Sequence, residues 1–468
     1  MFCKGGFQLR TSALPLAVAS LILVGTSVAL SATTAAASAT AAAESSATAA
    51  SSASGVWPGV GKICEPGPGG ASSVRGVGNK TINIAVFNDA ANTITPGLEV
   101  EFPEQATAFA DWCNAAGGID GRKIVVDNRD AALFNAAQQT TSACQSDFMA
   151  VGGGMALDQP AVPIREKCGL GQITGYVVSN ASVLASDQVD PGGGNTDSIP
   201  AGYFGAMTKA YPKAVKAAGM GAGDTPSVLQ PETKAEFGAE AQGWKVVDFL
   251  EPPVSVENWT PYVEQYQQKG VTALWPADDS NFTPFAEAMT TAGYHPAFVL
   301  LGTQFDNSQT QKDVADNPSL PPVYIETGWW PLAQASQNPS TEELVIIMHK
   351  YAKGDPVDFD DEEGVESWLL WAKDASACGA GNLTVSCVLN KAAATKNWDA
   401  GGIQAPIASL TLSNENPQPS PCFAMLKVEA KGIVYDKALT HPTQSIWNCN
   451  PKNVVQLTAA QQAQVNSL

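Results

Sequence analysis

The chain has 468 residues, enough for two or more domains with sizeable cores. It carries 26 Lys and Arg against 45 Asp and Glu, a formal net charge of −19. Because so acidic a chain repels phosphate groups and has no basic cluster, we exclude nucleic acids and anionic membrane surfaces as partners.

The N-terminus has the layout of a targeting segment. Lys4 and Arg10 form a short positive region, and an almost entirely small and apolar run extends from Ser12 to Leu30. This pattern predicts a secretory signal peptide over residues 1–30. An uncleaved membrane tether is the alternative, because about 20 apolar residues can span a bilayer. In either case we expect an exported protein of the cell envelope or the extracellular space.

A biased segment follows the targeting segment. Residues 31–54 are nearly all Ala, Ser and Thr, and Gly and Pro are frequent from Val56 to Lys80. Such composition is typical of a chain that builds no core of its own. We therefore predict a linker over residues 31–81.

Strands and helices alternate from Ile82 onward. Apolar runs predict strands at 82–87, 123–127, 148–152 and 172–178, and periodic runs predict helices at 99–115, 135–146 and 159–168. This order predicts a parallel sheet with helices on its faces. We assign residues 82–200 to a first lobe, with a polar connector from Asp187 to Pro200.

A second series of the same kind follows. It opens with a helix at 203–218 and continues with strands at 226–230, 244–249, 271–275 and 297–301 and helices at 233–242, 259–268 and 281–292. We assign residues 201–325 to a second lobe. Three further helices are predicted at 340–352, 360–377 and 384–395, followed by a tail of strands and loops.

Eight of the nine cysteines lie beyond the targeting segment, which contains Cys3. An even number in an exported chain indicates disulfides. Proximity, the ends of neighbouring helices and elimination suggest the pairs Cys378–Cys387, Cys422–Cys449, Cys144–Cys168 and Cys64–Cys113. Many other pairings remain open. The chain has no C-x-x-C, and its three His are far apart, so we expect no metal site and no cofactor.

Three phrases resemble the type I periplasmic binding proteins, in particular the leucine/isoleucine/valine-binding receptors of ABC importers. They are FADWCNAAGGIDGRKIVV, ENWTPYVEQYQQKGVTALWPADDSNFTPFAEAMTTAGYHPAFVLLGTQFD, and LTVSCVLNKAAATKNWDAGGIQAP with the later KVEAKGIVYD. They occur in family order over roughly 82–436. The resemblance implies an α/β fold of two lobes, with parallel sheets flanked by helices and three hinge crossovers near 196–203, 323–331 and 403–430. Residues 326–403 would return to the first lobe, and 404–468 would form the third crossover and the C-terminal tail.

The resemblance also implies a function. The two lobes would close over a small solute, and the membrane permease of an ABC importer would recognise the closed form. We expect such a receptor to act as a monomer. A ligand-sensing module that is not coupled to transport is the alternative. A secreted hydrolase is less favoured, because the chain has no G-x-S-x-G or H-E-x-x-H motif, so we expect no enzyme.

The loops that follow parallel strands line the ligand cleft in such sheets. The residues selected in this way are Asp89, Gly154, Met155, Ala156, Tyr176, Val178, Ser179, Asp278, Asp279, Gln304, Phe305, Asp306 and, from a crossover, Trp329. Simpler roles are open for several of them. Residues 152–154 can be only a tight turn, and Asp278 and Asp279 can cap the next helix. The acidic run 360–363 is expected to favour the positive start of its helix.

The family alignment raises a question about the solute. It places Ala156 and Val178 where amino acid receptors have hydroxyls, and Gln304 where they have a carboxylate. A buried ammonium group without a carboxylate is costly. Either the register slips toward Ser179 and Asp306, or the solute is not a standard amino acid. We expect a small organic solute of the amino acid, amide or aromatic type.

Overall fold

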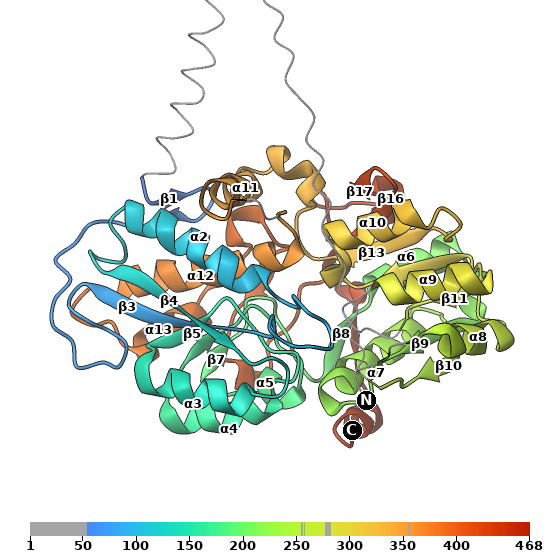
Figure 1. Ribbon diagram of the computed structural model, residues 1–468, viewed down its shortest axis with the longest axis horizontal. Helices are drawn as coiled ribbons and strands as arrows, with labels where there is room; N and C mark the ends of the chain where they lie inside the picture. The colour runs from blue at the N-terminus through green and yellow to red at the C-terminus, as the bar shows by residue number, and fades with distance from the viewer. Residues whose placement is uncertain (1–53, 254–255, 257, 277–281, 354–355) are drawn as a thin grey trace, which may run out of the picture. The chain divides into compact units, whose positions relative to one another are not determined.

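The computed structural model describes residues 54–468 except 254–255, 257, 277–281 and 354–355 (Figure 1). The predicted signal peptide and its alternative, an N-terminal tether, lie outside the described residues. Over the described part of the chain, no helix combines the length and the apolar character that a membrane crossing requires.

Five parallel strands form the first sheet, in the order β4-β3-β5-β6-β7. Their bounds are β3 (Thr81–Asn88), β4 (Lys123–Asp130), β5 (Met149–Val151), β6 (Gln172–Ile173) and β7 (Gln188–Val189). Six of the eight residues of β3 are buried. This is typical of an inner strand that is covered on both faces of a parallel sheet.

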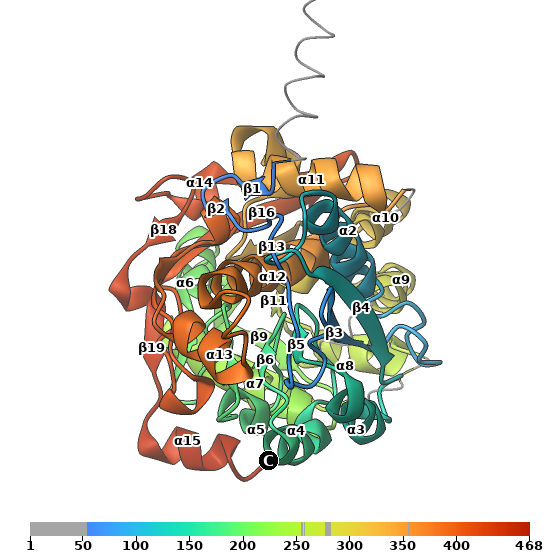
Figure 2. The same cartoon turned by 90° about the vertical axis from the view of Figure 1, so that its left-hand side faces the viewer.

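Helices from two parts of the sequence cover this sheet, and together they form the first lobe (Figure 2). They are α2 (Glu101–Ala115), α3 (Ala136–Ser146), α4 (Val162–Cys168), α11 (Pro339–Tyr351), α12 (Phe359–Cys378) and α13 (Val385–Ala393). Helix α12 packs against α2, α13, β5 and β6. Its Trp368 and Trp371 are fully buried in the core of the lobe, where Trp368 meets Phe109 of α2 at 5.4 Å between ring centres.

Eight strands form the second sheet, in the order β10-β9-β11-β12-β13-β16-β17, and β18 pairs with β16. Their bounds are β9 (Ala218–Gly221), β10 (Val246–Leu250), β11 (Ala273–Leu274), β12 (Phe298–Leu301), β13 (Val323–Thr327), β16 (Cys422–Glu429), β17 (Gly432–Tyr435) and β18 (Asn448–Cys449). The strands from β10 to β13 are parallel, and β16 joins β13 antiparallel. A strand from the C-terminal tail therefore completes a sheet that begins near the middle of the chain.

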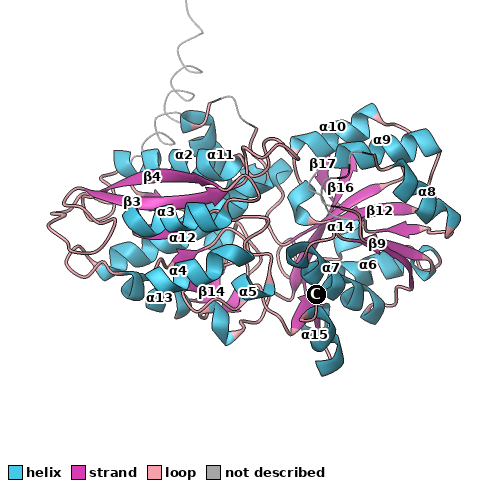
Figure 3. Cartoon of the chain, turned by 60° about the horizontal axis from the view of Figure 1, so that its bottom comes forward, coloured by secondary structure: helices cyan, strands magenta, loops and turns pink. Residues whose placement is uncertain are grey.

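The second lobe consists of this sheet and its helices (Figure 3). The helices are α6 (Gly202–Ala210), α7 (Pro226–Ala241), α8 (Thr260–Gln268), α9 (Phe282–Ala292), α10 (Ser308–Asp316) and α14 (Lys437–Thr440). The strand predicted at 226–230 is wrong, because Pro226 opens α7 there. With the two sheets and the helices on their faces, the predicted α/β class of two lobes is confirmed.

The chain changes sheets after β7, after β13 and before β16. Small strand pairs lie beside these passages: β8 (Ser198–Pro200) with β19 (Val454–Gln456), and β14 (Lys396–Trp398) with β15 (Ile407–Ser409). A single bridge joins Trp329 of the second passage to Gln404 of the third. The short helices α5 (Asn180–Val183) and α15 (Ala459–Val465) complete the fold together with the pair β1 (Val56–Trp57) and β2 (Gly61–Lys62).

The described part of the predicted linker is packed against the first lobe. Trp57 is fully buried, meets Trp112 at 5.4 Å between ring centres, and donates from Nε1 to Ser340 Oγ at 2.6 Å. Cys64 is bonded to Cys113 of α2. Trp57 and Cys64 thus attach the described part of the predicted linker to the first lobe, although its average composition predicts no core.

The structure contains all four predicted disulfides, which pair Cys64 with Cys113, Cys144 with Cys168, Cys378 with Cys387, and Cys422 with Cys449. The first three lie in the first lobe, and the fourth joins β16 to β18 in the second.

Candidate ligand-binding site

Asp89 follows the last residue of β3 and has no exposed surface. Its carboxylate accepts from the backbone N–H of Leu133 at 2.6 Å and from that of Ala156 at 2.8 Å. Burial raises the pKa of Asp89 above its ordinary value. Asp89 and Ala156 therefore lie together, and their hydrogen bonds join the loops that follow β3, β4 and β5.

The turn after β5 brings Gly154 against Tyr176. A Cβ atom at Gly154 would lie 2.2 Å from Cε1 of the Tyr176 ring, so only glycine fits there. Tyr176 stacks on Phe102 at 5.8 Å between ring centres, and its hydroxyl donates to Glu99. Met155 packs away from this contact, in a small core with Phe87.

Val178 and Ser179 follow β6, and both present their backbone N–H groups to Asp158, at 3.0 and 3.1 Å. The Ser179 hydroxyl accepts from Ser182 N and caps α5. The polar groups of these two residues thus have partners within the first lobe.

The predicted residues of the second lobe lie elsewhere. Phe305 is part of the apolar core of this lobe. Asp306 lines a small cavity of about 180 Å³, beside Pro331 and Val357. Gln304 lies in the short 3-10 helix that precedes Asp306. Asp278 and Asp279 lie outside the described residues.

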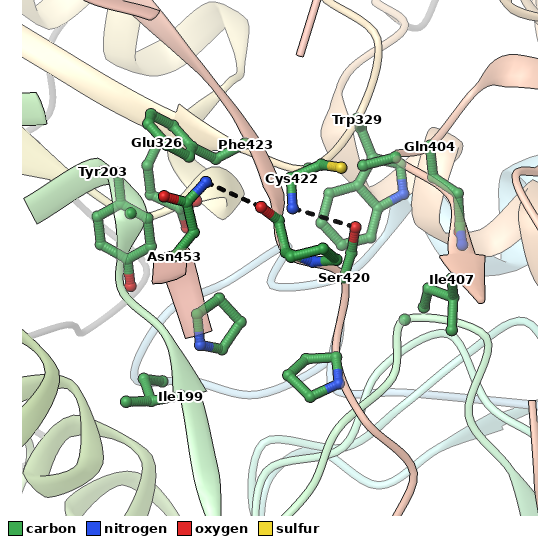
Figure 4. A pocket seen from close by; sticks show the side chains of 17 residues that line it. Ile199, Tyr203, Glu326, Trp329, Gln404, Ile407, Ser420, Cys422, Phe423 and Asn453 are labelled. Atoms are coloured by element: carbon green, nitrogen blue, oxygen red, sulfur yellow. Dashed lines mark hydrogen bonds between the residues drawn. The ribbon is translucent and has the colours of Figure 1, made fainter. Parts of the chain in front are cut away.

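A larger cavity, of about 260 Å³, lies where the chain passes between the sheets (Figure 4). Residues of regions 192–203, 326–329 and 404–423 line it, so all three passages contribute, and Asn453 of the tail adds a fourth contact. Of the residues selected from the sequence, Trp329 lines this cavity. We refer to it below as the crossover cavity.

The wall of the crossover cavity combines three aromatic rings with aliphatic and proline side chains and a few polar groups. Tyr203 of α6 and Trp329 lie on opposite sides in Figure 4, with Phe423 of β16 and Glu326 of β13 between them. Burial raises the pKa of Glu326 to about 7. The lining includes no Lys, Arg or His.

Three side-chain donors of this wall have partners within the protein. Gln404 Nε2 donates to Pro191 O at 3.0 Å, and Asn453 Nδ2 donates to Pro421 O at 2.8 Å (Figure 4). Trp329 Nε1 donates to Glu366 Oε2 at 3.1 Å. By contrast, Gln404 Oε1 is buried and has no hydrogen-bond partner among the described residues.

Glu366 belongs to a group of buried acids that we call the carboxylate cluster, namely Glu99, Asp190, Glu362, Glu363 and Glu366. Glu366 has no exposed surface, and its Oε1 has no hydrogen-bond partner among the described residues. A Cβ atom at Gly192 would lie 3.9 Å from this oxygen, and Gly192 lines the crossover cavity. The free oxygen of Glu366 therefore lies just behind the cavity wall.

The carboxylate cluster has no counter-charge in the salt bridges that the described residues form. Burial, and then the neighbouring acids, raise the pKa of Glu362, Glu363 and Glu366 well above their ordinary value. Asp190 raises the pKa of Glu366 in this way, while the hydrogen bond from Trp329 lowers it.

Sequence analysis missed most of the residues in and behind this cavity, including Tyr203, Glu326, Gln404, Phe423 and Glu366. The predicted residues follow strand ends, whereas the crossovers line the cavity. The crossovers themselves were predicted, so a search for aromatic and polar residues within them would have found the first four. Glu366 carries no such signal, because helical spacing alone does not show which face of α12 is buried.

The sequence profile of the family described as "Periplasmic binding protein" matches residues 104–432. A comparison with curated protein sequences finds no significant match.

Solved structures share the fold at low sequence identity. The fatty acid ABC transporter substrate-binding protein from Thermomonospora curvata is 16% identical, with a TM-score of 0.64 over 83% of this chain and 97% of that chain. A solute-binding protein from R. palustris in complex with 4-hydroxybenzoate is 12% identical, with a TM-score of 0.61 over 79% and 98%. A branched-chain amino acid transporter substrate-binding protein from Streptococcus pneumoniae in complex with isoleucine is 15% identical, with a TM-score of 0.58 over 76% and 100%.

Proposed function

The chain belongs to the periplasmic binding protein family, and from this premise we propose that it is an exported receptor that captures a small organic solute between its two lobes and delivers it to the permease of an ABC importer. Members of this family bind solutes and are not enzymes, so the hydrolase alternative is dropped.

The observation that carries the proposal is the position of the crossover cavity. All three passages between the sheets line it, so any rotation of one lobe against the other changes its shape. A solute held there has different contacts in the open and closed forms. Such a difference in affinity is what a ligand needs in order to shift the equilibrium toward closure.

The cavity supports a small solute with an apolar part. Its wall combines three aromatic rings with few polar side chains, which is the usual composition of small-molecule sites. Trp329 is the residue that we expect to contact the solute first. We further propose that the strand-end residues Tyr176, Gln304 and Asp306 contact the solute when the lobes close.

Native mass spectrometry of the purified protein tests the proposal, because a captured solute would add its mass to that of the chain. Thermal shift over a panel of amino acids, amides, amines and aromatic acids provides the second measurement. We expect at least one solute to raise the melting temperature, since a ligand that binds only the native state stabilises it. A protein that carries no solute and responds to none of the panel would contradict the proposal.

Coupling to transport separates the two remaining functions. An importer receptor should stimulate ATP hydrolysis by its cognate permease complex when the solute is present, whereas a sensing module should bind the solute without doing so. We favour transport because the structural neighbours named above are ABC transporter receptors. Export through cleavage after about residue 30 is part of the same proposal. Mass determination of the mature N-terminus from the native host tests it.

A further inference from the structure

We propose that the solute is an organic cation, with an ammonium group and no carboxylate, whose charge is held by Glu366 and Glu326 beside the rings of Trp329 and Tyr203. This inference rests on the function proposed above and names the chemical class of the solute. It sets this chain apart from the isoleucine and 4-hydroxybenzoate complexes among its structural neighbours.

Two buried oxygens, one in the wall of the crossover cavity and one behind it, lack a donor. Around the crossover cavity, the side-chain donors of Gln404, Asn453 and Trp329 are used within the protein. The buried oxygens Gln404 Oε1 and Glu366 Oε1 lack hydrogen-bond partners among the described residues. Buried acceptors without a partner are costly, so the missing component is a group that donates. An ammonium group offers three donors and no acceptor.

The charged side chains at the cavity are acidic. Glu326 lines the cavity and Glu366 lies directly behind its wall, while none of the lining residues is basic. A ligand carboxylate would meet two acidic side chains and no counter-charge. An ammonium group in the cavity would contact Glu326 and would be attracted by Glu366 behind the wall, and its charge would favour the ionised form of both acids.

Three aromatic rings form part of the cavity wall. Trp329 and Tyr203 lie on opposite sides of the cavity in Figure 4, and Phe423 lies between them. Aromatic faces attract cations, with Trp the strongest of them. The ring of Trp329 is held by its hydrogen bond to Glu366 and by an edge contact with Phe359 at 4.8 Å between ring centres. The side chain that faces the solute is therefore fixed by one of the acids that would bind it.

A metal ion fits the site less well. Among the residues that the structure describes, no group of three or more His, Cys, Asp or Glu side chains has an arrangement that could hold a metal ion. The apolar part of the wall also has no role in binding a bare ion, whereas it suits the carbon skeleton of an amine.

Matched ligand pairs test the inference on the mature protein. Benzylamine and benzoate share one ring and differ in the charged group, and isopentylamine and leucine share one side chain. Thermal shift and isothermal titration should show stabilisation and binding by the amines, and no binding of benzoate. If benzoate or leucine binds and the amines do not, the cation class is overturned while the receptor function stands. If no solute of any class binds, the receptor function itself fails.

The substitution Glu366→Gln provides the second test. It keeps the shape of the side chain and removes its charge, so we expect affinity for the stabilising amine to fall by at least about tenfold. The melting temperature without ligand should stay the same or rise, because a buried acid among like charges is removed. Glu342→Gln, at an exposed position on α11, is the control and should leave amine binding unchanged. Unchanged amine affinity in Glu366→Gln would overturn the assignment.

Discussion

At the level of single residues, Gly154 shows how closely the loops of the first lobe are fitted. Its Cα faces the ring of Tyr176, and a methyl group there would lie 2.2 Å from a ring carbon. We therefore expect Gly154→Ala to lower the free energy of unfolding by about 1–3 kcal/mol, because the ring must leave its stack on Phe102. Urea denaturation measures this change. Gly381→Ala is the control, since no heavy atom lies within 4 Å of its added Cβ.

Asp306 predicts a pH dependence of stability. Burial raises its pKa from the ordinary value near 3.8 to about 7. Between these values the native state keeps a proton that the unfolded state has lost, so the free energy of unfolding falls as the pH rises from about 4 to about 7. This decrease in the free energy of unfolding is complete above pH 7 and amounts to at most about 4 kcal/mol. Below pH 4 both states are protonated, and the effect is absent.

Asp306→Asn replaces the ionisable carboxyl group by an amide and so removes this pH dependence of the free energy of unfolding. We expect the variant to match the natural chain at pH 4 and to exceed it in melting temperature at pH 8. Asp316→Asn, at an exposed position of α10, serves as the control and should show the pH profile of the natural chain. Equal profiles for Asp306→Asn and the natural chain would show that Asp306 ionises normally.

The acidic run at the start of α12 shows what the sequence could and could not predict at this scale. Asp361 does act at the helix start, where it accepts from Asp358 N at 3.0 Å in a capping box. Asp361, Glu362 and Glu363 are nevertheless all buried. Helical spacing predicts which residues share a face. Whether that face is exposed depends on α2 and on the crossovers, which come from distant parts of the sequence.

At the level of elements, apolar strands were predicted well even where they are short, as in β5, β11 and β12, whereas a strand of small residues was missed. The predicted strand at 82–87 corresponds to β3. Strand β9 was missed, because its sequence AGMG has little of the β-branched character that signals a strand. Its small residues have a packing reason, since a Cβ atom at Gly219 would lie 2.7 Å from the ring of Tyr266. The β-propensity of a segment does not show that a helix packs against it and requires small residues there.

The C-terminal strand β19 has a role that its position at the end of the chain conceals. It pairs with β8 in the first passage between the sheets, and α15 behind it packs Val465 against Phe237 of α7. Deleting 454–468 should expose this apolar contact, lower the melting temperature and weaken solute binding, because Ile199 and Pro200 of β8 line the crossover cavity. Thermal shift with and without solute measures both effects. Deleting only 467–468 is the control.

At the level of the whole molecule, two adjacent tryptophans separate binding from folding. Trp329 lines the crossover cavity and donates to Glu366, whereas Trp330 packs beside Trp447 and donates to Gln334 O at 3.0 Å. We expect Trp329→Phe to weaken solute binding by about tenfold. Trp330→Phe should lower the free energy of unfolding and leave solute binding unchanged. Isothermal titration and urea denaturation, applied to both variants, measure the two effects.

Closure itself is measurable in solution. A captured solute should reduce the radius of gyration in small-angle X-ray scattering, since the ligand favours the closed form. Trp329→Phe should need about tenfold more solute for the same change, and Trp330→Phe should need no more than the natural chain. A radius that does not respond to a bound solute would contradict the hinge mechanism.

The placement of the four disulfides bears on this motion. Each joins two segments of the same lobe, so oxidation strengthens the halves separately and adds no covalent link from one to the other. The chain can thus gain resistance to heat and proteases while the rotation of one lobe against the other is free of any disulfide. In this fold the disulfides stabilise each lobe and place no covalent restraint on the hinge between the lobes.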